Sequence, residues 1–216
     1  MHKLERPEPP TCLARFRPGR DAWPDLGTDD RKEIRSQLAT MQGQRCAYCE
    51  VGLAIEVREG HIEHFEQRSR NSARTFDWDN LFGSCDQQDS CGKHKDRLAS
   101  TYRWADLIKP DVDDPDDYLR FLSDGRIVAR ESLDVEARRR AEETLRVFNL
   151  DHDCGRLRHM RRNAAYGYVG IIAELDEYAE ADTGLYLQYL IYLQNELQAI
   201  RGKPFETAIR HTLNPL

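Results

Sequence analysis

The sequence lacks several features that would place it in a common protein class. None of its 216 residues lies in an apolar run approaching the roughly 18 residues of a membrane-spanning helix, so no membrane span is expected. The first seven residues lack the apolar stretch of a secretory signal peptide, which makes the cytoplasm the expected compartment. A P-loop is also missing, so we do not expect this chain to hydrolyse ATP by that route.

Positive charge is scarce as well, because the formal net charge is −6 at pH 7. A protein with this balance needs a local basic patch or a partner if it is to bind nucleic acid. Apolar residues make up 39% and charged residues 32% of the chain, which describes a soluble protein with a modest core. The length allows one sizeable domain, or a small domain with a helical extension.

The first half of the chain alternates short apolar segments with turns. Residues 1–28, rich in Pro and Arg, predict an irregular arm that packs on the rest of the protein. Thr28 or Asp29 is a suitable N-cap for a helix that reaches about Met41. Two short strands are predicted at 54–57 and 61–65, paired as a hairpin, followed by a helix over 91–98.

The second half is mainly helical. Residues 110–117 form an acidic, proline-containing linker, and residues 119–122 and 126–129 flank an Asp-Gly turn that predicts a small hairpin. Apolar residues at three- and four-residue spacing then predict helices over 135–148, 157–178 and 185–200.

Four of the six cysteines are clustered. Cys46 and Cys49 form a C-x2-C pair, and Cys85 and Cys91 follow about 35 residues later. Such spacing in a reducing compartment predicts a tetrahedral Zn²⁺ site rather than disulfides. Four thiolates leave no position for water, so this zinc would be structural and would close a region too small to fold on apolar burial alone.

Between the two cysteine pairs lies a set of residues suited to phosphodiester hydrolysis. That reaction needs a base to activate water, a hard divalent cation, and a group that orients the base. His64 is the predicted general base, and its neighbour Glu63 the predicted carboxylate ligand of Mg²⁺ or Mn²⁺. Asn80 is expected to hold the imidazole of His64 through its side-chain amide.

Together these motifs resemble the zinc-containing HNH endonucleases of the ββα-metal superfamily. The segments Cys46–Glu50, Ile62–Phe65, Trp78–Phe82 and Cys91–Lys95 look more narrowly like the HNH subunit of Septu and retron-associated anti-phage systems. The resemblance covers about fifty residues. It implies His64 as the catalytic histidine, Glu63 as the acidic ligand and Asn80 as the central asparagine of the signature.

The last ligand of the catalytic metal departs from the family pattern. Many HNH enzymes carry His or Asn directly after the final cysteine, where this chain has Gly92. His94 is the preferred substitute, and Asp96 is the alternative because it lies four residues beyond Gly92 on the same helix face. The basic residue and proline that follow Glu-His-Phe in the family are here Glu66 and Gln67.

The predicted fold is therefore α+β and mostly helical. It comprises an arm and helix (1–44), a zinc-stapled ββα-metal core (45–108), and a hairpin with a helical partner-binding region (109–216). The expected contacts to a DNA or RNA substrate come from four basic residues, which are Arg68, Arg70, Lys93 and Lys95.

Three functions follow from this interpretation. The first is a metal-dependent HNH endonuclease that acts as the effector of an anti-phage complex. The resemblance implies that its partner is an ABC/SMC-like ATPase, which would control cleavage. The second is a non-catalytic zinc-finger adaptor that binds nucleic acid or protein. The third is a restriction-type or toxin-type HNH nuclease that acts alone.

Overall fold

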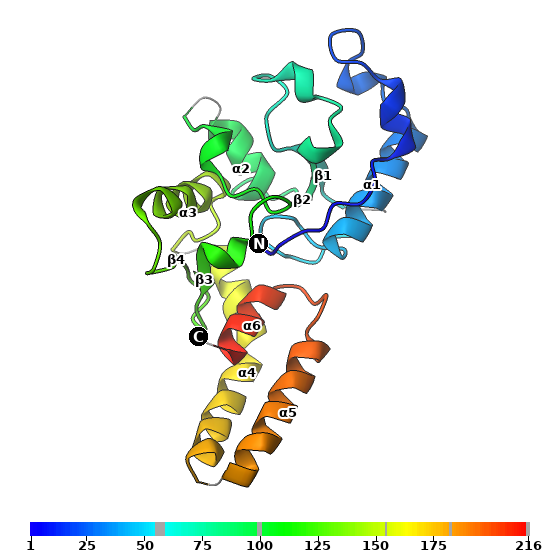
Figure 1. Ribbon diagram of the computed structural model, residues 1–216. Coiled ribbons are helices and arrows are strands. Elements are labelled where there is room, and N and C mark those ends of the chain that lie inside the picture. The colour runs from blue at the N-terminus through cyan, green and yellow to red at the C-terminus, as the bar shows by residue number, and fades with distance from the viewer. Residues whose placement is uncertain (55–58, 99–100, 154, 182, 215–216) are drawn as a thin grey trace.

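The computed structural model describes residues 1–54, 59–98, 101–153, 155–181 and 183–214. Within these ranges the protein is a mixed α/β structure, about half helical, with two small antiparallel sheets (Figure 1). Most of the buried apolar residues form one cluster that reaches from Met1 to Ala208, so segments distant in sequence share a core. No helix in the described part of the chain has the length and apolarity to cross a membrane.

The first long helix, α1 (Thr28–Gln42), confirms the helix predicted from apolar periodicity, but the predicted cap was wrong, because Gly27 is the N-cap and Thr28 and Asp29 already lie within the helix. The backbone N–H of Gly27 donates to the Asp30 carboxylate, and Gly43 ends the helix with a φ of 58°. Gln42, fully buried, exchanges hydrogen bonds of 2.6 and 2.9 Å with the backbone of Gly83. The end of α1 is thereby fixed to the strand that crosses the centre of the molecule.

The central sheet differs from the predicted hairpin. Strand β1 (His61–His64) pairs antiparallel with β2 (Leu81–Ser84), in a register that places Glu63 opposite Phe82. The predicted partner strand at 54–57 falls largely outside the described residues. Strand β2 is buried along its whole length and shows no polar–apolar alternation, so the sequence pattern did not predict a strand there. Helix α2 (Cys91–Leu98) follows as predicted and completes a β–β–α unit.

The predicted second hairpin and the helix after it are confirmed. Strands β3 (Leu119–Phe121) and β4 (Ile127–Ala129) pair across the Asp-Gly turn. Helix α3 (Val135–Phe148) begins at Asp134, whose side chain accepts from the N–H of Ala137. Helix α3 packs on α2 and contributes Phe148 to the central core.

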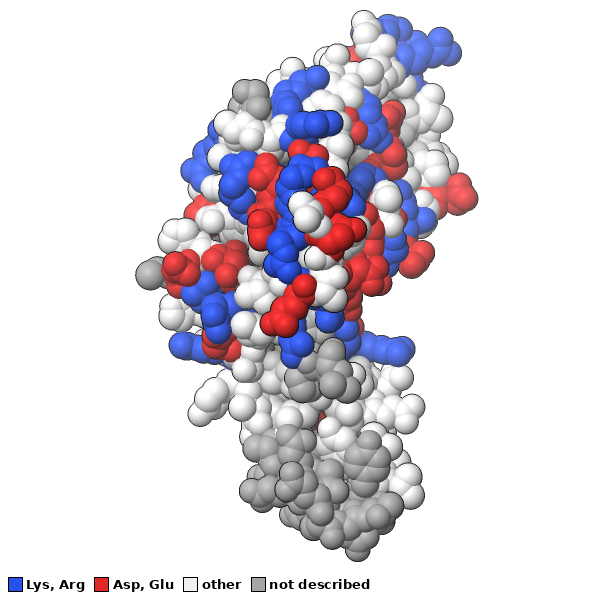
Figure 2. Space-filling model, turned by 60° about the vertical axis from the view of Figure 1, so that its left-hand side comes forward, with Lys and Arg blue, Asp and Glu red and all other residues white. Residues whose placement is uncertain are grey.

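Two long helices project from this body. Helices α4 (Arg156–Ala181) and α5 (Thr183–Ala199) run side by side, as Figure 1 shows, and agree with the predicted helical tail. A short helix that the sequence pattern did not reveal, α6 (Glu206–Leu213), packs against α4 and β3. In space-filling form, basic and acidic side chains are interspersed over the body of the molecule (Figure 2).

The N-terminal segment packs on the body, as the sequence predicts for the arm at 1–28. Leu4 donates its backbone N–H to the carbonyl of Pro110, 2.8 Å away. The Arg6 guanidinium lies over the ring of Phe82 and donates to the carbonyls of Trp78 and Leu81. The arm therefore braces the entry to β2 from outside the β–β–α unit.

Candidate functional site

The four clustered cysteines meet in space. Their sulfur atoms all lie within 4.8 Å of one another, and all four side chains are buried. Around a tetrahedral zinc with Zn–S bonds of about 2.3 Å, neighbouring sulfur atoms stand about 3.8 Å apart. The Sγ atoms of Cys49 and Cys85 are separated by 3.9 Å, and the N–H of Cys85 donates to the Sγ of Cys46. The cluster thus has the composition and spacing of a site that could hold a metal ion such as zinc.

The four cysteines come from three parts of the chain. Cys46 and Cys49 lie in the turn after α1, Cys85 directly follows β2, and Cys91 is the first residue of α2. The long gap between the second pair is a loop, and its return brings Cys91 into the left-handed region with a φ of 56°. Bridging these sulfurs would fix α2 against the sheet.

His64 ends β1 and is almost completely buried, with 6% of its surface exposed. Its Nε2 lies 3.0 Å from the carbonyl oxygen of Thr75. Because a carbonyl only accepts, Nε2 must carry the hydrogen of the neutral ring, and the lone pair is left on Nδ1. The Trp23 ring meets the imidazole edge-on, 4.4 Å between centroids.

The protonation state of His64 follows from this burial. Desolvation lowers its pKa to about 4, although the Thr75 carbonyl and the charge of Glu63 act in the opposite direction. His64 is therefore neutral at physiological pH, which is the state that a general base requires.

Glu63 is buried beside a lysine. Lys95, fully buried, places its Nζ 2.8 Å from Oε1 of Glu63 and 3.0 Å from both the carbonyl oxygen of His64 and Oδ1 of Asp96. Burial alone would raise the pKa of Glu63, but the charge of Lys95 and the nearby imidazole of His61 outweigh it and lower that pKa. Glu63 is thus an ionised carboxylate in the interior.

The predicted role of Lys95 in binding nucleic acid is wrong, because this ammonium has no access to a phosphate. Lys95 lies four residues after Cys91 and three after Gly92, both buried, so helix periodicity places it on the face that packs inward. That spacing was the signal that sequence reasoning missed. Lys95 instead fixes the carboxylate of Glu63 and the end of β1.

Asn80 does not orient the imidazole as predicted. Its Oδ1 accepts from the N–H of Glu66, and its Nδ2 donates to the carbonyls of Glu66 and Arg74. These bonds occupy both donor hydrogens of the amide. Asn80 therefore closes the loop between β1 and β2, and the contact to His64 comes from Thr75 in that loop.

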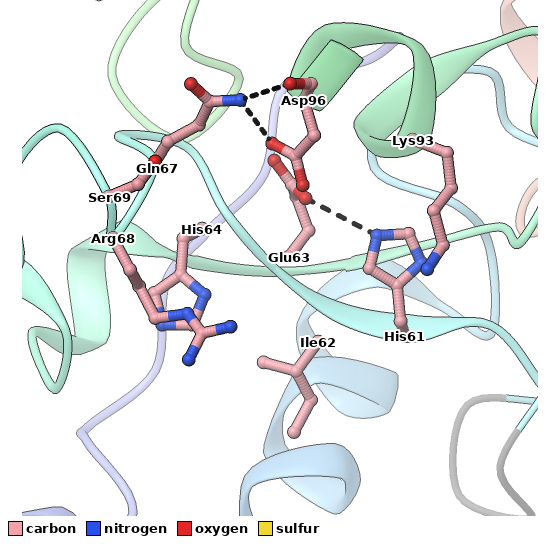
Figure 3. Close-up of a pocket in the computed structure, with 9 residues that line it drawn as sticks. All are labelled: His61, Ile62, Glu63, His64, Gln67, Arg68, Ser69, Lys93 and Asp96. Carbon is pink, nitrogen blue, oxygen red and sulfur yellow. Dashed lines mark hydrogen bonds and ion pairs between the residues drawn. The ribbon is translucent and has the colours of Figure 1, made fainter. Parts of the chain in front are cut away.

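The two candidates for the last ligand lie in different places. His94 directs its Nδ1 to the carbonyl of Val147 on α3, 2.9 Å away. Asp96 instead lines the cleft above Glu63, where its Oδ1 accepts from Gln67 at 2.8 Å (Figure 3). Of the two candidates, only Asp96 lines the cleft beside Glu63, so the preferred candidate His94 is the less well placed.

The cleft at this site has a volume of about 650 Å³ and is open to solvent. Figure 3 shows the side chains that line it from β1, the following loop and α2, which are His61, Ile62, Glu63, His64, Gln67, Arg68, Ser69, Lys93 and Asp96. The structure thus brings the two predicted catalytic residues to one opening.

Two of the four predicted basic contacts line this cleft. Arg68 is exposed beside His64, and the side chain of Lys93 is 37% exposed on the other side. Arg70 lies elsewhere, stacked over Tyr102 and Trp104. A negatively charged ligand in the cleft would therefore meet Arg68 and Lys93.

Trp23 and Thr75 contact His64, which the sequence pattern did not reveal. Both reach His64 from segments without regular strand or long-helix pattern, so only the folded arrangement identifies them.

Compared with known proteins, the chain matches no protein-family model and no curated protein.

Proposed function

We propose that this protein is a metal-dependent HNH-type endonuclease that hydrolyses phosphodiester bonds. The observation that carries the proposal is the pairing of a neutral His64 with an ionised Glu63 at one cleft. These two residues end a strand of a β–β–α unit whose elements converge on a four-cysteine cluster. That combination is the arrangement expected of a zinc-containing ββα-metal nuclease.

In the proposed reaction, Nδ1 of His64 accepts a proton from the attacking water. The Thr75 carbonyl keeps the ring in the tautomer that leaves this nitrogen free. A bound phosphodiester brings negative charge beside the imidazole, which raises the pKa of His64 toward the working pH. Arg68 and Lys93 would hold the phosphate at the mouth of the cleft.

The residues present suit a divalent cation. Glu63 is ionised, and the buried Nε2 of His61 beside it has no hydrogen-bond partner among the described residues. When bound there, Mg²⁺ or Mn²⁺ would supply charge neutralisation for the transition state and the leaving oxygen. Lys95 keeps Glu63 charged and oriented toward the cleft.

A partner fits the charge and surface of the molecule. The net charge of −6 gives weak electrostatic attraction to a polyanion, and only a few basic residues line the cleft. Helices α4 and α5 expose large apolar side chains, including Tyr166, Leu187 and Ile191. Such a surface suits protein docking, and we propose an ABC/SMC-like ATPase as the protein that binds it.

One observation favours the alternative of a non-catalytic zinc adaptor. Glu63 already has a cationic partner in Lys95, and an ion pair could replace the catalytic metal altogether. An adaptor would contain zinc and would leave the cleft without a second metal.

The test is cleavage by the zinc-loaded protein, alone and with its co-purified partner, on plasmid DNA and structured RNA in Mg²⁺ or Mn²⁺. His64→Ala should reduce the rate at least a hundredfold while retaining zinc. His159→Ala, which removes an exposed histidine on α4, is the matched control and should cleave normally. Equal cleavage by the His64 variant would refute the assignment.

A further inference from the structure

The position after the last cysteine has no side chain, yet the space beside it is filled. A Cβ atom built on Gly92 would lie 2.5 Å from Oε2 of Glu63 and 2.9 Å from Nε2 of His61. Both distances are shorter than non-bonded atoms tolerate, so any larger residue would displace these two groups. Gly92 is therefore the residue that allows His61 and Glu63 to approach each other beside α2.

His61 and Glu63 share one face of β1 because they are two residues apart. Their facing atoms, Nε2 and Oε2, are separated by 3.4 Å, which is longer than a normal N–H···O hydrogen bond. Two ligand atoms that each lie about 2.1 Å from one metal are about 3.0 to 3.4 Å apart, depending on the bond angle. The observed separation therefore matches a pair of ligands on a common ion.

The orientation of His61 is set from its other side. Nδ1 lies 3.1 Å from a carboxylate oxygen of Asp86, in the loop between Cys85 and Cys91. A histidine that binds a metal commonly donates its second ring N–H to a carboxylate, which fixes the ring and leaves the other nitrogen free. In this arrangement Nε2 of His61 presents its lone pair toward Glu63.

The two carboxylate oxygens of Glu63 likewise face different partners. Oε1 faces the Lys95 ammonium, and Oε2 faces His61. Both side chains line the open cleft, while Nε2 of His61 is itself buried and has no hydrogen-bond partner among the described residues. The remaining positions of an ion held by this pair would be those that face the cleft. The side chain of His61 is 20% exposed and that of Glu63 is 2% exposed.

We propose that His61 supplies the nitrogen ligand of a divalent-metal site shared with Glu63, beside the backbone of Gly92. Its catalytic meaning rests on the proposed nuclease function. The site combines one imidazole with one carboxylate and solvent, and imidazole suits transition metals better than Mg²⁺. The protein should therefore bind Mn²⁺ more tightly than Mg²⁺ and Co²⁺ or Ni²⁺ more tightly still.

The experiment measures metal binding without any nucleic acid. Full-length protein that retains one equivalent of zinc, with all other zinc removed by dialysis, is titrated with Mn²⁺, and free Mn²⁺ is followed by electron paramagnetic resonance. We expect His61→Ala to weaken Mn²⁺ binding at least tenfold, while His94→Ala, the control on the other side of α2, stays within twofold. Gly92→Ala should weaken binding as well, because its Cβ displaces both ligands. Circular dichroism and zinc content verify that each variant folds.

The outcomes separate this proposal from the nuclease function. Unchanged Mn²⁺ affinity in His61→Ala, or no Mn²⁺ binding by the parent protein, would show that His61 is only an ion-pair partner of Glu63 and Asp86. His61-dependent Mn²⁺ binding with no cleavage of DNA or RNA would support the metal site and overturn the nuclease. Cleavage that survives His61→Ala with unchanged metal affinity would do the reverse.

Discussion

The buried lysine offers the sharpest test of the site's architecture. Replacing Lys95 with Met keeps a long apolar side chain of similar reach and removes only the ammonium. Glu63, 2% exposed, would then be a buried carboxylate without its cationic partner. We expect this variant to lose stability far beyond what a surface lysine contributes.

The magnitude follows from what Lys95 contacts. Its Nζ lies 2.8 Å from Glu63 and 3.0 Å from the His64 carbonyl, and both partners are buried. Removing one member of a buried ion pair typically costs about 3–5 kcal/mol, since the other charge stays desolvated. Lys93→Met is the matched control on the same helix, because its side chain is 37% exposed. A substitution of that kind should change stability by no more than about 0.5 kcal/mol.

The assay is urea unfolding followed by circular dichroism, with zinc at a fixed saturating concentration. Adding Glu63→Gln to Lys95→Met should restore part of the lost stability, because no buried charge remains. The pH dependence has a defined sign. In the parent protein the pKa of Glu63 is lowered, so its contribution is present above the unfolded pKa and is lost as pH falls through the folded one.

In Lys95→Met the pKa of Glu63 should instead rise, so acidification would stabilise the variant relative to the parent. The difference in unfolding free energy between the two should therefore shrink below about pH 5. Unfolding of Lys95→Met within about 1 kcal/mol of the parent at pH 7, with no response to Glu63→Gln, would refute the buried pair.

Three further predictions address the metal cluster, the N-terminal contact and the base. Cys85→Ser should lower the zinc content measured by atomic absorption and the melting temperature by several degrees. Glu50→Gln should cost about 3 kcal/mol in urea unfolding, because Glu50 is buried against the Met1 α-amino group, 2.5 Å away. The value of kcat/KM for cleavage, which reports the protein without substrate, should rise with pH through about 4, where His64 loses its proton, and Trp23→Ala should move this rise toward pH 6.5 by admitting water.

Much of the fold could be predicted from local patterns. Apolar spacing located α1 to within a residue or two, although its N-cap is Gly27 rather than Thr28 or Asp29, and the Asp-Gly turn located β3 and β4. The four clustered cysteines could be identified from the sequence, because Cys46 and Cys49 form a C-x2-C pair and a second pair, Cys85 and Cys91, follows in the same region of the chain. These features depend on neighbours within a few residues, which is the range that periodicity and turn chemistry describe.

What the sequence did not reveal depends on long-range packing. Strand β2 has four buried residues. It pairs with β1 so that His64 lies opposite Leu81, seventeen residues later in the sequence, and no local signal specifies this pairing. Helix α6 has only eight residues. Its N-cap is Phe205, which has a φ of 59° and no side chain that can cap a helix. In the candidate site, Lys95 was misassigned because a charged residue was expected at the surface.

The brace formed by the N-terminal arm also determines how far the motif can be treated as a portable unit. Arg6 holds the entry to β2, and Trp23 covers His64, although neither belongs to the fifty residues that carry the HNH-like pattern. A graft of that segment into another scaffold would bring the cysteines and His64 without the Arg6 and Trp23 contacts that hold β2 and shield the imidazole from water. A minimal version of this site should therefore begin at the N-terminal arm rather than at the first cysteine.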